Sequence, residues 1–251
     1  MTGDTSVNLF DLHQGLPREA PGNDAATERA LHLLPALPAF GAVLDIGCGP
    51  GAQTIALARN LKGTITAIDT HRPYLDELES RARSAGLAER IVTLQVSMDA
   101  LPFERESFDL IWAEGSIYII GFEIGLRLWR PLVRTNGYIV VSELTWLTDA
   151  PPGAAREFWG RAYPAMASIE QNRTTIERCG LGLVADFVLA ADAWFEDYLT
   201  PLEEKIAALR QRLARDPAAL QFLGDQQMEI DIVRRYGNAF GYVFYAMQRR
   251  E

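Results

Sequence analysis

Cysteine and histidine are scarce in this sequence. Its 251 residues include two cysteines, Cys48 and Cys179, and three histidines, His13, His32 and His71. The cysteines lack the short spacing of a metal-binding pair and the histidines are scattered, so the sequence predicts no metal site. Two distant cysteines also give no reason to expect a disulfide framework.

Positive charge and long apolar runs are scarce as well. The formal net charge is −9, and Lys and Arg never form a run longer than two. Such a surface repels phosphate backbones and anionic lipid, so neither nucleic acid nor a membrane is an expected partner. No apolar stretch approaches the roughly 20 residues of a membrane helix. Residues 1–19 lack the basic and apolar regions of a secretory signal, so we expect a cytoplasmic protein.

Apolar residues as a whole are plentiful, at 48% of the chain, which is enough for a hydrophobic core. Between residues 42 and 144, short apolar segments typical of strands alternate with segments typical of helices. The expected strands are 42–47, 64–69, 91–96, 108–113 and 137–144, and the expected helices are 54–61, 73–85 and 123–130. Strands that are apolar on both faces and alternate with helices predict an α/β fold with a parallel sheet covered on both sides.

The flanking segments are less regular. Residues 1–23 are polar, contain several Gly and Pro, and predict an irregular arm. Asp24 is the expected N-cap of a helix that ends before Pro38. After a break at 149–153, the expected elements are helices at 154–167, 169–179, 194–215 and 218–236, and strands at 183–189 and 242–248.

A glycine-rich turn joins the first expected strand to the next helix, with the sequence Asp45-Ile46-Gly47-Cys48-Gly49-Pro50-Gly51. Glycines allow a sharp bend and a close approach of the backbone to a ligand. The following helix offers free N–H groups and a partial positive charge. Because sheets of this kind bind ligands at the carboxyl ends of their strands, the turn predicts a site for a nucleotide-type cofactor.

Two cofactors fit this turn. Gly47-x-Gly49-x-x-Ala52 satisfies the dinucleotide pattern, whereas Asp45 followed by three alternate glycines satisfies the pattern for S-adenosylmethionine (SAM). Asp45 favours SAM, because a buried carboxylate repels a pyrophosphate but suits the ammonium group of the methionine portion, partly through water. Asp69, at the end of the second strand, can accept both hydroxyls of a ribose in either cofactor, or can cap the helix that follows.

Over residues 42–144, with a matching C-terminal strand, the sequence resembles the class I SAM-dependent methyltransferases. It looks most similar to the branch of ubiquinone- and menaquinone-biosynthesis and related small-molecule methyltransferases. The motifs are residues 43–51, Asp69, Leu101-Pro102-Phe103 with Ser107-Phe108-Asp109, and Asn136-Gly137-Tyr138. The resemblance implies a doubly wound, mostly parallel sheet of seven strands in the order 3-2-1-4-5-7-6, with the last strand antiparallel.

The resemblance also implies the residues that hold SAM: Asp45, Gly47, Cys48, Gly49, Gly51, Asp69, Thr70, Ser97, Met98, Asp99 and Glu114. In the family, the glycine turn lines the methionine part and the acid after the second strand holds the ribose. Residues 97–99 are expected to grip the adenine, but this chain has Ser97 where the family usually has Asp. Either Ser97 makes a weaker contact or Asp99 turns in, and the Met98 N–H can still donate to the ring.

The substrate side offers three candidate catalytic residues: Glu114, Tyr118 and Glu143. Methyl transfer from a sulfonium is an in-line displacement, in which positioning and desolvation can supply much of the catalysis. Some substrates also need a base, and the ends of the fourth and fifth strands place these three residues near the cofactor. Glu114 could instead contact backbone amides of the methionine site, and Glu143 could cap a helix or form a surface ion pair.

Three further segments could border the substrate. Aromatic residues after the fifth strand either roof the site or form the core of a small helical lobe: Trp146, Phe158, Trp159 and Tyr163. His13 and Gln14 either close over SAM as part of the arm or are incidental. Residues 194–198 either line the pocket or form a homodimer contact.

Together these observations predict a single methyltransferase domain over residues 1–251. Its expected parts are an arm and helix (1–40), a cofactor-binding core (41–148), and substrate-side helices with the last two strands (149–251). The fourth strand ends without the Asn/Asp-Pro-Pro-aromatic signature, which argues against methylation of nucleic-acid bases or amide nitrogens. We expect methyl transfer from SAM to a small organic molecule. The alternatives are an NAD-type oxidoreductase and a protein of this fold that binds SAM without turnover.

Overall fold

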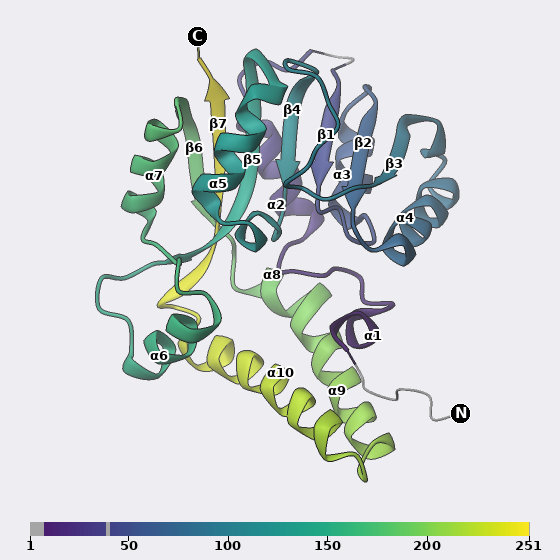
Figure 1. Ribbon diagram of the computed structural model, residues 1–251, viewed down its shortest axis with the longest axis vertical. Coiled ribbons are helices and arrows are strands. Elements are labelled where there is room, and N and C mark those ends of the chain that lie inside the picture. Colours follow the sequence, from purple (N-terminus) through teal and green to yellow (C-terminus); the bar gives the residue numbers. More distant parts are fainter. Residues whose placement is uncertain (1–7, 39–40, 251) are drawn as a thin grey trace.

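A seven-stranded sheet in the order β3-β2-β1-β4-β5-β7-β6 forms the centre of the computed structural model, which describes residues 8–38 and 41–250 (Figure 1). The strands are β1 (Val43–Ile46), β2 (Ile65–Asp69), β3 (Ile91–Gln95), β4 (Phe108–Ala113), β5 (Val133–Trp146), β6 (Leu181–Val188) and β7 (Phe240–Arg249). Strands β1 to β5 pair in parallel, and β7 is antiparallel to both β5 and β6. The predicted fold class, strand order and antiparallel last strand are confirmed.

Helices surround the sheet. They are α1 (Leu9–His13), α2 (Asp24–His32), α3 (Ala52–Asn60), α4 (Arg72–Ser84), α5 (Phe122–Trp129), α6 (Gly153–Ala162), α7 (Ile169–Arg178), α8 (Asp192–Trp194), α9 (Thr200–Arg212) and α10 (Pro217–Tyr236). Figure 1 shows α9 and α10 side by side beyond the ends of the parallel strands, with α1 next to α9. The helices of the C-terminal half and the N-terminal arm therefore meet at one edge of the sheet.

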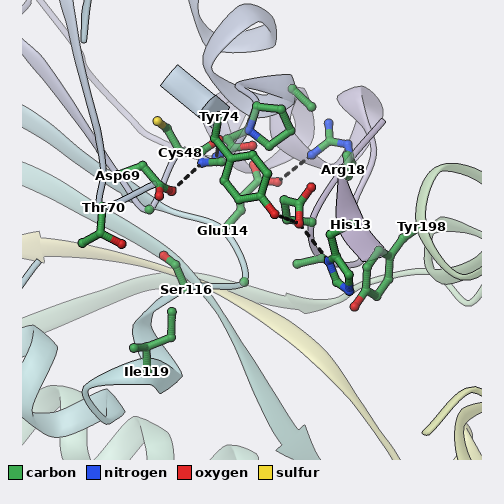
Figure 2. A pocket seen from close by; sticks show the side chains of 18 of the residues that line it. His13, Arg18, Cys48, Asp69, Thr70, Tyr74, Glu114, Ser116, Ile119 and Tyr198 are labelled. Atoms are coloured by element: carbon green, nitrogen blue, oxygen red, sulfur yellow. Dashed lines mark hydrogen bonds and ion pairs between the residues drawn. The ribbon is translucent and has the colours of Figure 1, made fainter. Parts of the chain in front are cut away.

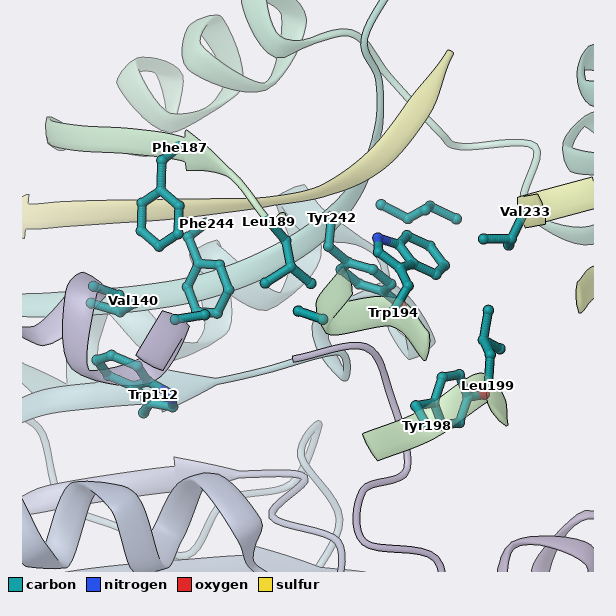
Figure 3. Close-up of a cluster of buried hydrophobic side chains, with 14 of the residues drawn as sticks. Trp112, Val140, Phe187, Leu189, Trp194, Tyr198, Leu199, Val233, Tyr242 and Phe244 are labelled. Carbon is teal, nitrogen blue, oxygen red and sulfur yellow. The ribbon is translucent and has the colours of Figure 1, made fainter. Parts of the chain in front are cut away.

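The sheet is buried on both faces. One apolar cluster joins α2 and α3 to side chains such as Trp112, Val140 and Phe244 (Figure 3). A second cluster joins α5 and α7 to Ile111 and Val141, the chain neighbours of Trp112 and Val140. Because successive side chains of a strand point to opposite faces, a strand covered on both sides has to be apolar throughout, as the sequence is here.

The N-terminal segment differs from the expected irregular arm. Residues 9–13 form the short helix α1, which begins with a capping box between Asn8 and Asp11. Asn23, not Asp24, is the N-cap of α2, because its Oδ1 accepts the N–H of Ala26 at 2.8 Å. Asp24 is the first residue of that helix and pairs with Arg18 instead. Residues 1–7 of the predicted arm lie outside the described residues.

Two helices of the C-terminal half also end differently. The helix expected at 154–167 stops at Ala162, because Pro164 disfavours helical geometry in the residue before it. The single helix expected at 194–215 is divided into α8, a π-helical turn at Phe195–Leu199, and α9. Pro201 lies in the first turn of α9, where its missing N–H costs no helical hydrogen bond. No helix within residues 8–38 and 41–250 is both long and apolar enough to cross a membrane.

Candidate active site

The glycine-rich turn forms one wall of a cavity of about 540 Å³ at the carboxyl ends of β1, β2 and β4. The strand order reverses between β1 and β4, and the crevice at such a point is where doubly wound sheets bind ligands. Figure 2 shows residues of the arm and of the C-terminal helices facing the turn across this space. The site is therefore built from segments that are far apart in the sequence.

Two glycines of the turn are required by geometry. Gly47 has φ +70°, and a Cβ on it would lie 2.5 Å from Cβ of Ser116, so no other residue fits against the cavity wall. Gly51 has φ +87° at the start of α3, and a Cβ there would lie 2.2 Å from Cδ1 of Leu78. Gly47, Cys48 and Gly49 line the cavity. Gly51 is not among the described lining residues, and its contact with Leu78 permits close packing of α3 on α4.

Asp69 lies on the cavity wall next to Thr70. Its Oδ2 accepts the N–H of Gly49 at 3.0 Å, and its Oδ1 accepts the N–H of His71 at 2.8 Å. Burial raises the pKa of Asp69, while these backbone N–H groups oppose the shift. Helix α4 begins after its N-cap, His71, and no side chain accepts from the first turn of the helix. The Asp69 carboxylate binds the N-cap residue itself and also fixes the glycine turn against the end of β2.

Asp45 is fully buried behind the glycine turn. Its Oδ2 accepts a hydrogen bond from Oγ1 of Thr54 at 2.5 Å, and its Oδ1 has no partner. Burial raises its pKa to about 7. A buried acceptor without a partner is unusual in a folded protein. Asp45 is not among the described residues that line the cavity, so its negative charge acts on a ligand from behind the turn.

Of the three residues expected to contact the adenine, only Met98 lines the cavity, together with Val96. The backbone carbonyl of Met98 accepts from the indole of Trp129 at 2.9 Å, which fixes this loop. Ser97 and Asp99 are exposed, and the Ser97 hydroxyl donates to the Asp99 carboxylate. Neither is among the described lining residues, because the two side chains bind each other outside the cavity. Val96 was missed, although it follows β3 directly.

Glu114 forms a buried ion pair with Arg18, with 3.2 Å between Oε2 and Nη1 (Figure 2). Its Oε1 accepts from Oγ1 of Thr27 at 2.7 Å and from the indole of Trp112 at 2.8 Å. Burial raises the pKa of Glu114, and the guanidinium of Arg18 opposes that shift. Both oxygens are engaged by side chains, not by backbone amides. Glu114 lines the cavity, but its main effect is to fasten the arm to the end of β4.

A second cavity, of about 160 Å³, adjoins the first. Six residues line both cavities: Glu19, Ala20, Pro21, Tyr118, Tyr198 and Glu229. The remaining wall is mostly aromatic: Leu144, Trp159, Ala162, Tyr163, Trp194 and Tyr242. Of the expected roof residues, Trp159 and Tyr163 therefore border this space. Trp146, at the end of β5, packs against Phe240 of β7, and Phe158 packs against Trp159 within α6.

Glu143 is buried on β5, with 2% of its surface exposed. Its Oε1 accepts from the hydroxyl of Tyr163 at 2.6 Å, and its Oε2 has no partner. Burial raises the pKa of Glu143 to about 8, and the bond from Tyr163 opposes the shift. The helix-cap and surface-ion-pair alternatives are both wrong. Glu143 is not among the described residues that line either cavity, and it reaches the second one only through Tyr163.

The sequence interpretation missed an acidic group between the arm and α10. Oε2 of Glu19 lies 2.8 Å from Nδ1 of His13 and accepts the hydroxyl of Tyr74 at 2.6 Å. Glu229 enters from α10, and burial raises its pKa while His13 opposes the shift. His13 was considered only as a residue of the arm. Gln14 is exposed and its carbonyl accepts from Lys205, away from the cavity.

The structure thus brings together most of the expected cofactor residues around one cavity. The glycine cradle would be filled by any Cβ at Gly47, the acid Asp69 stands on the wall, and an unpartnered acceptor of Asp45 lies beneath. These features fit the methionine and ribose parts of SAM. No group of three or more His, Cys, Asp or Glu side chains in the described part of the chain could hold a metal ion.

Comparisons with known proteins agree. The model of a methyltransferase domain family matches residues 43–137. The chain is 25% identical to 27-O-demethylrifamycin SV methyltransferase of Amycolatopsis mediterranei, over 78% of this chain and 73% of that protein. It is 31% identical to dimethylglycine N-methyltransferase of Parasynechococcus marenigrum, over 44% of this chain and 41% of that protein. A SAM-dependent methyltransferase of Geobacter sulfurreducens, solved with S-adenosyl-L-homocysteine (SAH), has the same fold, with a TM-score of 0.82 and 18% sequence identity. The match covers 98% of this chain and 99% of that chain.

Residues 43–137 therefore match a methyltransferase domain family, and the whole chain has the fold of a SAM-dependent methyltransferase. These matches support the predicted class of enzyme and SAM as the methyl donor, and they favour SAM over the dinucleotide alternative. The chain spans about half the length of several curated relatives that it matches. The ubiquinone-related branch stays a prediction.

Proposed function

We propose that this methyltransferase transfers the methyl group of SAM to a small organic molecule held in the second cavity. The observation that carries the proposal is the wall that the two cavities share, from Glu19 to Pro21 in the arm and at Tyr118, Tyr198 and Glu229. An acceptor in the aromatic cavity lies beside a donor held by the glycine turn. Close placement of two reactants is a large part of what such an enzyme has to supply.

Different residues of this chain would bind the cofactor, hold the arm in place and exclude water. Gly47 and Gly49 would cradle the methionine part, Asp69 would accept from the ribose, and Met98 would border the adenine. When bound, SAM supplies a methyl group on an electrophilic sulfonium. The buried pair of Arg18 and Glu114 holds the arm across the site, and the aromatic walls of the second cavity exclude water.

Several further assignments remain predictions. The relatives named above methylate an oxygen in one case and a nitrogen in the other, so they leave the acceptor atom of this chain open. We also propose that the protein is cytoplasmic and does not bind nucleic acid, in line with its net charge of −9. Trp194 and Tyr198 line the second cavity, which favours the pocket alternative over a homodimer contact for residues 194–198.

The test of the cofactor site is Asp69→Ala. We expect it to weaken SAH binding about tenfold or more, since a hydrogen bond to a charged group contributes roughly 1.5–3 kcal/mol. Loss of the acceptor for the Gly49 and His71 amides should also lower thermal stability slightly. Calorimetric titration with SAH measures the affinity. Asp76→Ala, which removes an exposed acid from α4, is the matched control. Equal affinity in both variants would remove Asp69 from the site.

Methyl transfer itself is tested by product formation. The protein is incubated with SAM and a panel of small amines and alcohols with matched carbon skeletons, and SAH release and methylated product are followed by mass spectrometry. We expect SAH release that depends on the acceptor. Tight binding of SAH without product from any acceptor would favour the alternative of a SAM-binding protein without turnover.

Asp45 predicts a proton exchange on cofactor binding. Burial raises its pKa to about 7, so the carboxyl keeps a proton in part of the molecules near neutral pH. The ammonium group of the methionine part favours the ionised carboxylate, so binding should release protons. Titrations of SAH in two buffers with different ionisation enthalpies measure that release. Asp45→Asn should abolish most of it, and an undiminished release in this variant would place the titrating group elsewhere.

A further inference from the structure

Glu19 stands where the two cavities meet. It lines both of them, and a Cβ on Gly49 would lie 3.2 Å from its Cγ. Its Oε2 is occupied by His13 and by the hydroxyl of Tyr74. Its Oε1 is buried and has no hydrogen-bond partner. The carboxylate is therefore held in place through one oxygen, and its other oxygen has no partner in a side chain that borders both cavities.

The ring of His13 fixes the Glu19 carboxylate. Nδ1 faces that carboxylate at 2.8 Å, so Nδ1 carries the hydrogen. Buried polar atoms in folded proteins almost always have partners. The unpaired Oε1 of Glu19 therefore calls for a ligand group that donates a hydrogen bond.

The charge of the second cavity also favours a ligand that donates hydrogen bonds and is positively charged. Its described lining includes two acids, Glu19 and Glu229, and neither Lys nor Arg. The rest is dominated by aromatic rings: Tyr118, Tyr163, Tyr198, Tyr242, Trp159 and Trp194. Aromatic faces attract cations, most strongly where water is excluded. An anionic acceptor would be repelled here, whereas a cationic one would be attracted by the two acids and by the aromatic faces.

We propose that the acceptor is the nitrogen of a small secondary or tertiary amine, which enters as the ammonium ion and donates its N–H to Oε1 of Glu19. This rests on the proposed methyl transfer and names its substrate class. Glu19 is then a catalytic residue, because it touches the reacting nitrogen. His13 and Tyr74 are positioning residues that hold the carboxylate through its other oxygen.

The proposed step is balanced. The ammonium group gives its proton to Oε1 of Glu19, and the freed nitrogen lone pair forms the bond to the methyl carbon. The bond between sulfur and the methyl carbon breaks, and its electron pair stays on sulfur. The positive charge of the sulfonium ends on the methylated nitrogen, while Glu19 becomes a neutral carboxylic acid that later returns its proton to water.

The test uses SAH-loaded protein and three probes of similar size: trimethylammonium, tetramethylammonium and tert-butanol. The first has a charge and an N–H, the second only a charge, and the third neither a charge nor an N–H. We expect affinity, measured by ligand-observed NMR, to fall in that order. Trimethylammonium should bind about tenfold more tightly than tert-butanol. This comparison needs no variant, so it does not depend on the folding of an altered chain.

Glu19→Gln keeps the size of the side chain and removes its charge. It should weaken trimethylammonium binding about tenfold and leave tert-butanol binding unchanged. Glu89→Gln removes an exposed acid of the 3₁₀ turn Ala88–Arg90 and should leave all three affinities as they are. SAH titrations on each variant show whether the cofactor site is intact.

Each possible outcome of these experiments either supports or overturns the amine proposal. Retained SAH binding with no preference for trimethylammonium over tert-butanol, or with an equal preference in Glu19→Gln, overturns the amine proposal and leaves the proposed function standing. In the acceptor panel, turnover of an alcohol but not of its matched amine does the same. Failure of the unmodified protein to bind SAH overturns both proposals together. The expected ranking, lost only in Glu19→Gln, supports the amine.

Discussion

Replacing Arg18 with methionine should destabilise the folded protein by about 3–5 kcal/mol, the usual cost of leaving a buried charge without its partner. Arg18 has 5% of its side chain exposed, and Glu114 has 4%. Methionine fills much the same volume but leaves the Glu114 carboxylate with only Thr27 and Trp112 as partners. Because the pair ties the arm to β4, the variant should also bind SAH more weakly.

Urea unfolding at pH 7 measures the first effect, and Arg59→Met is its matched control. Arg59 also pairs with Asp24, at 3.4 Å, but 58% of its side chain is exposed, so its loss should cost at most about 1 kcal/mol. The double variant Arg18→Met, Glu114→Gln removes both charges and should recover much of the lost stability. A cost for Arg18→Met no greater than that of Arg59→Met would show that the buried pair does not anchor the arm.

The cofactor side of the site was largely predictable from sequence, because its determinants are local. The turn at Gly47 and Gly49 follows directly from a strand and precedes a helix, so its position at the sheet edge is set by a few neighbouring residues. Asp69 closes the next strand, and parallel strands end at the same edge. Ser97 and Asp99 were expected to contact the adenine but do not line the cavity. The cause is local too, because the two side chains form a hydrogen bond with each other.

The substrate side was not predictable in the same way. Glu19 and Glu229 share a cavity wall only because α1 packs against α9 and α10 returns beside α9. No spacing rule connects an acid in a Pro- and Gly-rich arm to one on a helix near the other end of the chain. Glu143 differs from Glu19 and Glu229, because the sequence singled it out but did not show its distance from the cavity. Its position at an apolar strand was noticed correctly, but only the structure shows that Tyr163 stands between it and the cavity.

Glu143 provides the strongest expected dependence of stability on pH. Its pKa is about 8 in the folded protein, raised from 4.5 by burial. Between these values the folded state keeps a proton that the unfolded state has released. Stability therefore falls as the pH rises through this window, by up to about 1.4 kcal/mol per pH unit for one proton. Below the window both states are protonated, and the full benefit of the neutral carboxyl is present.

Glu143→Gln removes this titration while its amide oxygen can still accept from Tyr163. We expect the variant to gain stability relative to the unmodified protein as the pH rises from 5 to 8, by several kcal/mol in all. Urea unfolding at each pH measures the difference, and Glu89→Gln, an exposed position, should give a curve parallel to that of the unmodified protein. A constant difference between Glu143→Gln and the unmodified protein would mean that the carboxyl is ionised in the fold. In that case a compensating positive charge has to reach Oε2, the oxygen that has no partner in the structure.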